Sequence, residues 1–173
     1  IRAIDESSRA AGQLLDHAMI TFRADHLERE DIDLVGLVRE LVQRLTPIAD
    51  LKDVSLSLSS DPTVPHLGDP ILIQNAVRNI MDNALKYAPD DSMIEISVVA
   101  TPRPQITICD QGPGFPSNQI DTLTTRFQRG ENAGDTIGSG LGLTIAQDVA
   151  KAHDGDLALS NRPEGGACVT LSL

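Results

Sequence analysis

The sequence predicts an α+β fold: a two-layer sandwich in which one mixed, mainly antiparallel sheet carries three helices on one face. Two observations lead to this expectation. Short stretches of alternating apolar and polar residues occur mostly in pairs joined by turn residues, which favours hairpins of strands with one buried face. Three longer stretches with apolar residues at helical spacing lie between them. This mixture is typical of a helical layer packed on an antiparallel sheet.

Length and charge limit what the protein can be. Its 173 residues favour one domain, or one domain with an appended element. Fourteen Lys and Arg against 25 Asp and Glu give a net charge of −11. That charge repels nucleic acids and anionic membrane surfaces, so neither is expected as a partner. No apolar run approaches the roughly 20 residues of a membrane-spanning helix.

The two cysteines, Cys109 and Cys168, are far apart in the sequence, and each lies within an apolar alternation. A buried free thiol behaves as a small hydrophobic group. We therefore expect two separate thiols in the core rather than a disulfide, which favours a cytosolic setting.

The chain begins with Ile rather than Met, which indicates a piece of a longer protein. Between Ile4 and Phe22, small or apolar residues recur at alternating steps of four and three, the pattern of a heptad seam in a helical bundle. A helix that lies on its own domain is the alternative. The charged, aperiodic residues 24–31 are predicted to form a linker.

The next segment begins with a helix. Asp33 is a suitable N-cap for a helix from Leu34, which Pro47 should end or kink. Alternating residues then predict strands over 54–58 and 64–67.

A second helix follows. Asp69 can cap it, and Pro70 suits its first position, where a missing N–H costs nothing. It should run to about Tyr87. Two further strands are predicted over 93–99 and 105–109.

Residues 110–140 lack periodicity, and a loop of this length inside a compact domain is usually functional. A last helix is predicted from about 141 to 153, ended by Gly155. Strands over 157–160 and 167–173 complete the sheet.

The second helix carries the first group of candidate functional residues. Asn79, Asn83 and Lys86 share one helical face. An Asn oxygen is a suitable ligand for Mg²⁺, and a Lys ammonium suits phosphate oxygens. A pair of Asn at the solvated edge of a helix is the alternative interpretation.

The second group follows the strand over 105–109. Asp110 is succeeded by Gly112 and Gly114, which let the backbone approach closely. Its carboxylate could accept a hydrogen bond from an exocyclic amine while a flat ring lies against the turn. An ordinary Asp-capped turn is the alternative.

The third group is the glycine-rich segment 138–143, which opens the last helix. Backbone amides at a helix N-terminus suit a polyphosphate. The segment matches neither the P-loop nor the dinucleotide fingerprint. Alone, it could also be a flexible hinge.

Together these segments resemble a known family. Residues 79–89 (NIMDNALKYAP), 110–116 (DQGPGFP), 126–130 (RFQRG) and 138–143 (GSGLGL) are similar, in this order, to the N, G1, F and G2 boxes of sensor histidine kinases. These kinases belong to the GHKL superfamily, whose catalytic domains have the Bergerat fold. The resemblance implies an ATP-binding catalytic domain over 32–173. Residues 1–31 resemble the second helix of the dimerisation and histidine-phosphotransfer bundle, followed by a linker.

The resemblance also implies roles for single residues, with ATP and Mg²⁺ as cofactors. Asn83 would bind the metal and Lys86 the phosphates. Asp110 would receive the adenine amino group, helped through water by Thr170, and residues 126–130 would belong to a lid. The implied positions are Asn79, Asn83, Lys86, Tyr87, Asp110, Gly112, Gly114, Arg126, Phe127, Arg129, Gly138, Gly140, Leu141, Gly142 and Thr170.

The implied activity is transfer of the γ-phosphate of MgATP to a histidine and relay to the receiver domain of a response regulator. None of the four histidines has the family's acceptor signature: His17 precedes Ala18 and His26 precedes Leu27, where the family has an acid. The acceptor is therefore expected outside this chain, on the bundle of a homodimer. The resemblance further implies a cytoplasmic domain of a parent anchored in the bacterial inner membrane. His153 is expected to be a cation at a helix C-terminus.

Two other functions fit the same residues. The domain could bind nucleotide and regulate a partner without transferring phosphate. It could also be an ATPase of another GHKL branch, of topoisomerase or chaperone type, in which a Glu on the N-box helix activates water. Asn79 takes that place here and is a poor base.

Overall fold

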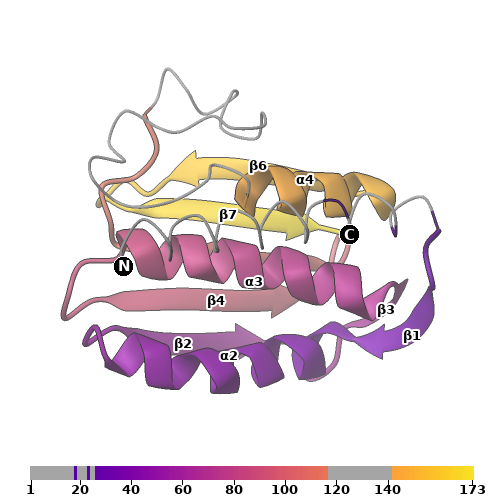
Figure 1. Cartoon of the computed structure of the whole chain (residues 1–173), viewed down its shortest axis with the longest axis horizontal. Helices are drawn as coiled ribbons and strands as arrows, with labels where there is room; N and C mark the ends of the chain where they lie inside the picture. The colour runs from indigo at the N-terminus through magenta and orange to yellow at the C-terminus, as the bar shows by residue number, and fades with distance from the viewer. Residues whose placement is uncertain (1–17, 19–22, 24–25, 117–141) are drawn as a thin grey trace.

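The computed structural model describes residues 18, 23, 26–116 and 142–173. Its helices lie side by side in one layer against the larger of two sheets (Figure 1). The helices of the described ranges are α2 (Leu34–Asp50), α3 (Pro70–Tyr87) and α4 (Gly142–Ala152). The strands are β1 (Glu30–Asp33), β2 (Ser55–Ser60), β3 (Pro65–Gly68), β4 (Met93–Val99), β5 (Gln105–Cys109), β6 (Asp156–Asn161) and β7 (Ala167–Ser172).

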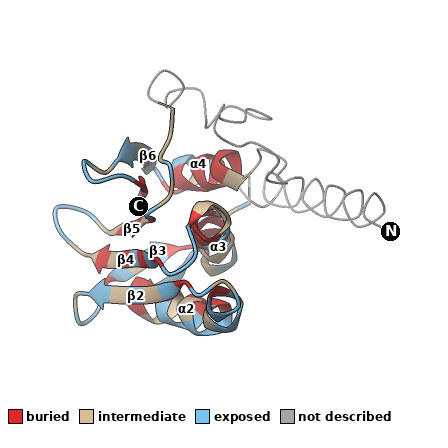
Figure 2. Cartoon of the chain, turned by 90° about the vertical axis from the view of Figure 1, so that its left-hand side faces the viewer, coloured by how far each residue is buried: buried red, intermediate tan, exposed pale blue. Residues whose placement is uncertain are grey.

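The larger sheet has five strands in the order β2-β4-β5-β7-β6. Only β2 and β4 are parallel, and the other neighbours are antiparallel. The three helices cover one face of this sheet (Figure 2). The expected α+β sandwich, with a mixed, mainly antiparallel sheet, is therefore confirmed. None of the helices in the described residues is long and apolar enough to cross a membrane.

The core lies between the helices and this sheet. Ile94 and Ile96 of β4 and Ile106 and Ile108 of β5 are almost completely buried. Their neighbours in each strand point to the opposite face, because successive strand side chains alternate. The residues of that opposite face are exposed or half-buried, and we call it the open face of the sheet.

Both expected helix starts are confirmed. Asp33 caps α2 by accepting from the N–H of Val35, and it also accepts from the N–H of Val64 (3.2 and 2.9 Å). Asp69 caps α3 by accepting from the N–H groups of Ile71 and Leu72 (3.1 and 3.2 Å). Each carboxylate thus satisfies amide groups that a helix start leaves unpaired.

Contrary to one expectation, Pro47 does not end its helix: α2 continues to Asp50. Leu45 and Ala49 are buried on both sides of the proline, while Pro47 itself is exposed. The carbonyl that loses its donor therefore faces solvent, and packing of the buried residues maintains the helix. Of the two expected effects of Pro47, the end of the helix is wrong, and the kink stays a prediction.

The N-terminal region differs from expectation at one point. Residues 30 and 31, expected in a linker, belong to β1, which pairs antiparallel with β3 in a separate two-stranded sheet. This strand crosses the boundary expected between 31 and 32. Of the predicted heptad seam only Ala18 is described, and it is helical. The rest of the seam lies outside the described residues.

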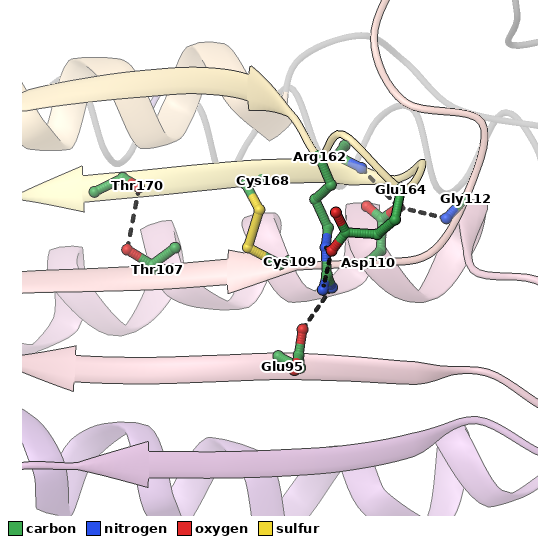
Figure 3. The surroundings of a disulfide bond; sticks show 10 residues. Glu95, Thr107, Cys109, Asp110, Gly112, Arg162, Glu164, Cys168 and Thr170 are labelled. Carbon is green, nitrogen blue, oxygen red and sulfur yellow. Dashed lines mark hydrogen bonds and ion pairs between the residues drawn. A yellow bond between two sulfur atoms is a disulfide. The ribbon is translucent and has the colours of Figure 1, made fainter.

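The expectation of two free core thiols is wrong. Cys109 of β5 and Cys168 of β7 are cross-strand partners and form a disulfide (Figure 3). Their neighbours Ile108 and Val169 are buried under the helices, so the two cysteines point to the open face of the sheet, where they are half-buried. The alternating pattern locates both strands correctly, but the two cysteines lie on the open face and not, as expected, on the core face.

Candidate functional site

Asp110 follows β5 at the edge of the helical layer and is only 4% exposed. Its Oδ1 accepts hydrogen bonds from the N–H groups of Gly112 (2.8 Å) and Ala167 (3.2 Å). Among the described residues, no hydrogen bond reaches Oδ2. Burial raises the pKa of this carboxyl, against the opposing effect of the two N–H donors and of Arg162. The site therefore holds a buried carboxylate in one orientation, with one oxygen available to a donor.

The turn after Asp110 packs against the end of α3. A Cβ at Gly112 would lie 2.5 Å from the carbonyl oxygen of Tyr87, so only glycine allows this approach. The G1-like turn and the end of the N-box-like helix, predicted separately, are thus in direct contact.

The turn is held from a third element by Asn161, which sequence reasoning missed. Its side-chain amide accepts from the N–H of Phe115 and donates to the carbonyl of the same residue (both 2.7 Å). Gly114 has a positive φ of 76° and lies against Asn161 Oδ1. No local pattern announces Asn161, because its partner is 46 residues away.

The residues predicted on α3 lie along one half-buried face. Asn79 donates from Nδ2 to the carbonyl of Asn75 (2.8 Å), and its Oδ1 lies 3.3 Å from the place of a Cβ at Gly142, the first residue of α4. Asn83 follows one turn later. Lys86 Nζ donates to the hydroxyl of Tyr87 (3.0 Å) and lies 4.6 Å from the centre of that ring.

The structure does not bring Thr170 to Asp110, which corrects the role expected for it. In β7 the buried Ala167 and Val169 alternate with residues of the open face, and Thr170 belongs to the open face. Its hydroxyl bonds that of Thr107 there (3.1 Å). The residue of this strand that contacts Asp110 is Ala167, which has no side-chain polar atom and gave no signal in the sequence.

Several expected site residues lie outside the described residues: Arg126, Phe127, Arg129, Gly138, Gly140 and Leu141. In the described first turn of α4, the buried hydroxyl of Thr144 has no hydrogen-bond partner. The described residues contain no group of three or more His, Cys, Asp and Glu able to hold a metal ion. A metal at this site would need ligands of another kind, such as the amide of Asn83 and the oxygens of a nucleotide.

Comparison with known proteins agrees with this geometry. Residues 68–173 match the family of histidine kinase-, DNA gyrase B- and HSP90-like ATPases. The sensor protein KdpD of Escherichia coli K12 is 34% identical over 168 residues, which are 96% of this chain and 19% of that protein. The sensor-like histidine kinase SenX3 of Mycobacterium tuberculosis H37Rv is 33% identical over 83% of this chain and 36% of its own length.

Among solved structures, the ATP-binding domain of PrrB from Mycobacterium tuberculosis superposes with a TM-score of 0.69 at 27% identity, over 84% of this chain and 96% of that domain. This chain spans about a fifth of the length of KdpD and about a third of SenX3. By its family match and its relatives, the chain belongs to the histidine kinase-, DNA gyrase B- and HSP90-like ATPases, and it is homologous to the catalytic ATP-binding domains of sensor histidine kinases.

Proposed function

We propose that this chain binds MgATP and transfers its γ-phosphate to a histidine outside the chain, as the catalytic domain of a sensor histidine kinase. One observation carries the proposal. Three segments far apart in the sequence converge: the Asp110 turn contacts Tyr87 at the end of α3, and Asn79 of α3 contacts the start of α4. A buried acceptor, a Lys and a helix N-terminus are the groups that adenine and a polyphosphate require.

The proposed roles follow from this arrangement. The adenine amino group donates to Asp110 Oδ2, beside the close approach of Gly112. Lys86 and the N-terminus of α4, which begins at Gly142, hold the phosphates, and Asn83 is a metal ligand. Mg²⁺, when bound, neutralises charge on the phosphate oxygens. The domain thus positions the γ-phosphate and stabilises its charge, although the net charge of the chain is −11.

The remaining assignments are also proposals. Gly138, Gly140 and Leu141 would extend the phosphate site, and Arg126, Phe127 and Arg129 would contact the nucleotide from the lid segment. The phosphoacceptor helix of a homodimer would supply the nucleophile, with residues 1–31 as part of that bundle. A response regulator receiver domain would then accept the phosphate, in the cytoplasm.

Hydrolysis without an acceptor is the other activity that this site could perform. It requires a base beside the γ-phosphate, and the candidate position holds Asn79. An amide is not a base, and its Nδ2 is engaged by the carbonyl of Asn75. The lack of a base at this position favours transfer to an external histidine over activation of water.

A transfer assay tests the proposal. A longer parent that carries its own acceptor histidine, inactivated by Asp110→Asn, should become labelled when this chain and γ-labelled MgATP are added. The chain alone should acquire no acid-labile phosphate, and His17→Ala should change nothing. Transfer should rise with the concentration of the chain, because tethering is lost. Normal MgATP binding without transfer at any concentration would instead identify a regulatory nucleotide-binding module.

A further inference from the structure

The disulfide joins the two residues that are next in the chain to Asp110 and Ala167. Cys109 immediately precedes Asp110 in the chain, and Cys168 immediately follows Ala167. Asp110 and Ala167 are joined twice: the N–H of Asp110 donates to the carbonyl of Ala167 (2.9 Å), and the N–H of Ala167 donates to Asp110 Oδ1 (3.2 Å). The covalent link between β5 and β7 is therefore one residue from the contacts that orient this carboxylate (Figure 3).

The contact between these two strands leaves little space for adjustment. Gly166, which precedes Ala167, is buried and has a positive φ of 110°. A Cβ at this glycine would lie 2.0 Å from the carbonyl oxygen of Asp110. A small displacement of β7 relative to β5 must therefore move Asp110 or break its bonds, because packed backbone transmits strain.

The two cysteines are only partly buried. Both cysteines are half-buried on the sheet face opposite the one that the described helices α2, α3 and α4 cover. The partner of Cys109 on the adjacent strand β4 is Glu95. Arg162 forms ion pairs with Glu95 and with Glu164 (2.7 Å to the latter). Partial exposure gives an external thiol access to the bond, whereas a fully buried disulfide is inert to exchange.

We propose that Cys109 and Cys168 form a redox-active pair whose state sets the affinity of the adjacent site for adenine nucleotides. This inference rests on the proposed function, because the ligand is the one assigned to Asp110. The disulfide state holds β5 and β7 together and keeps Asp110 oriented. In the dithiol state the two strands are no longer linked. Part of the binding free energy of the nucleotide is then used to order β5, β7 and Asp110, so the affinity is lower.

The chemistry is thiol–disulfide exchange. A thiolate of a small dithiol attacks one sulfur, the bond between Cys109 and Cys168 breaks, and a mixed disulfide forms. The second thiol of the reagent then displaces the cysteine held in the mixed disulfide, so the protein gains two electrons and two protons and the reagent becomes a cyclic disulfide. A low-molecular-weight disulfide of the glutathione type reverses the reaction and is reduced to two thiols.

The test compares the two states of the same chain. Protein is oxidised with glutathione disulfide or reduced with dithiothreitol, its thiols are counted by alkylation and mass spectrometry, and ADP affinity is measured by calorimetry. We expect no free thiols in the oxidised protein and two in the reduced protein. ADP should bind about fivefold more weakly, or weaker still, in the reduced state, because fivefold is the lower end of the usual range of coupling between two sites. Because coupling is reciprocal, saturating ADP should shift the reduction equilibrium toward the disulfide by the same factor.

Matched variants define the outcomes. Cys109→Ser with Cys168→Ser, or the same pair changed to Val if the first fails to fold, should bind ADP equally with and without dithiothreitol. Thr107→Val, on the same strand and face, should keep the redox response. Unchanged affinity while the thiol count rises from none to two overturns the coupling alone. A thiol count that never changes overturns the exchange, and absence of ADP binding in both states overturns the proposed function together with this inference.

Discussion

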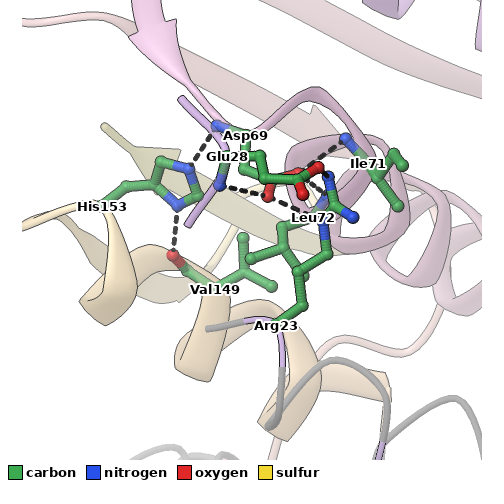
Figure 4. A network of polar contacts seen from close by, with 7 residues as sticks. All are labelled: Arg23, Glu28, Asp69, Ile71, Leu72, Val149 and His153. Carbon is green, nitrogen blue, oxygen red and sulfur yellow. Dashed lines mark hydrogen bonds and ion pairs between the residues drawn. The ribbon is translucent and has the colours of Figure 1, made fainter. Parts of the chain in front are cut away.

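The backbone N–H of Asp69 donates a 2.9 Å hydrogen bond to Nε2 of His153, 84 residues further along the chain (Figure 4). His153 Nδ1 lies 2.8 Å from the carbonyl of Val149. The neutral imidazole with its proton on Nδ1 makes both bonds, so the expectation of a cation at this helix end is wrong. The contact joins the start of α3 to the end of α4, the two helices that carry the candidate site.

The same point anchors the preceding segment. Asp69 is completely buried, and its Oδ2 accepts from Arg23 Nε (2.7 Å) and from the N–H of Glu28 (3.2 Å). Burial alone would raise the pKa of this carboxyl, but Arg23 and the backbone donors outweigh that effect and lower it. Asp69 therefore stays ionised through the pH range in which histidine titrates.

Stability should fall between pH 7.5 and pH 5.5. The ring of His66 lies 6.0 Å from that of His153, and burial, together with the charge of Arg29, lowers the pKa of His66. Its folded pKa thus lies below the ordinary value of about 6.5, so the unfolded chain takes up protons first and stability is lost as pH falls through that value. Urea unfolding of His66→Leu should show a flatter pH profile. Leu67→Gln, on the same strand, should keep the slope, and an unchanged slope in His66→Leu would contradict the assignment.

Asp110→Asn should abolish tight nucleotide binding without unfolding the protein. Oδ1 keeps its bonds from Gly112 and Ala167, so the new amide nitrogen takes the place of Oδ2 and presents a donor to the adenine amino group. Loss of a buried, charge-assisted bond of about 1.5–3 kcal/mol corresponds to roughly ten- to 150-fold weaker binding. Calorimetry with ADP measures it, and Asp90→Asn, an exposed carboxylate, is the control. Equal affinities for both variants would rule out this contact.

Asn83→Ala should weaken binding of a non-hydrolysable ATP analogue more with Mg²⁺ than without it. The side chain lies on the same α3 face as Asn79 and Lys86, where an amide oxygen can ligate a metal. With Mg²⁺ present, we expect the variant to bind the analogue roughly tenfold more weakly, as metal sites do when they lose a supporting group. With a chelator present in place of Mg²⁺, we expect little change in affinity. Gln43→Ala removes an exposed amide from α2 and should change neither value. Equal losses with and without Mg²⁺ would argue against the metal role.

Gly166→Ala should destabilise the protein more than Gly165→Ala. Both glycines have positive φ (110° and 99°), so either substitution costs about 1–2 kcal/mol in backbone conformation. Only Gly166 adds a steric clash, because its Cβ would lie 2.0 Å from the carbonyl oxygen of Asp110, whereas nothing lies within 4 Å of a Cβ at Gly165. Urea unfolding should show at least twice the loss for Gly166→Ala, together with weaker ADP binding. Similar losses for both would mean that the turn adjusts freely.

Local chemistry determined most of the elements. Asp33 and Asp69 specify helix starts because their side chains satisfy amides two or three residues away, and Ile106 and Ile108 specify a strand because side chains alternate. The motif around Asp110 was recognisable for the same reason, since Gly112 is two residues from the carboxylate that it serves.

Contacts between distant residues were decided only by the tertiary structure. Four features each depend on a residue from another element: the sheet face on which Cys109 and Thr170 lie, the pairing of β1 with β3, the hydrogen bonds of Asn161 to the turn, and the partner of His153. A period of two locates a strand, but at its half-buried positions it does not say which face meets the helices. A helix end favours a cation, yet Nε2 of His153 accepts from the N–H of Asp69, because a buried N–H requires an acceptor.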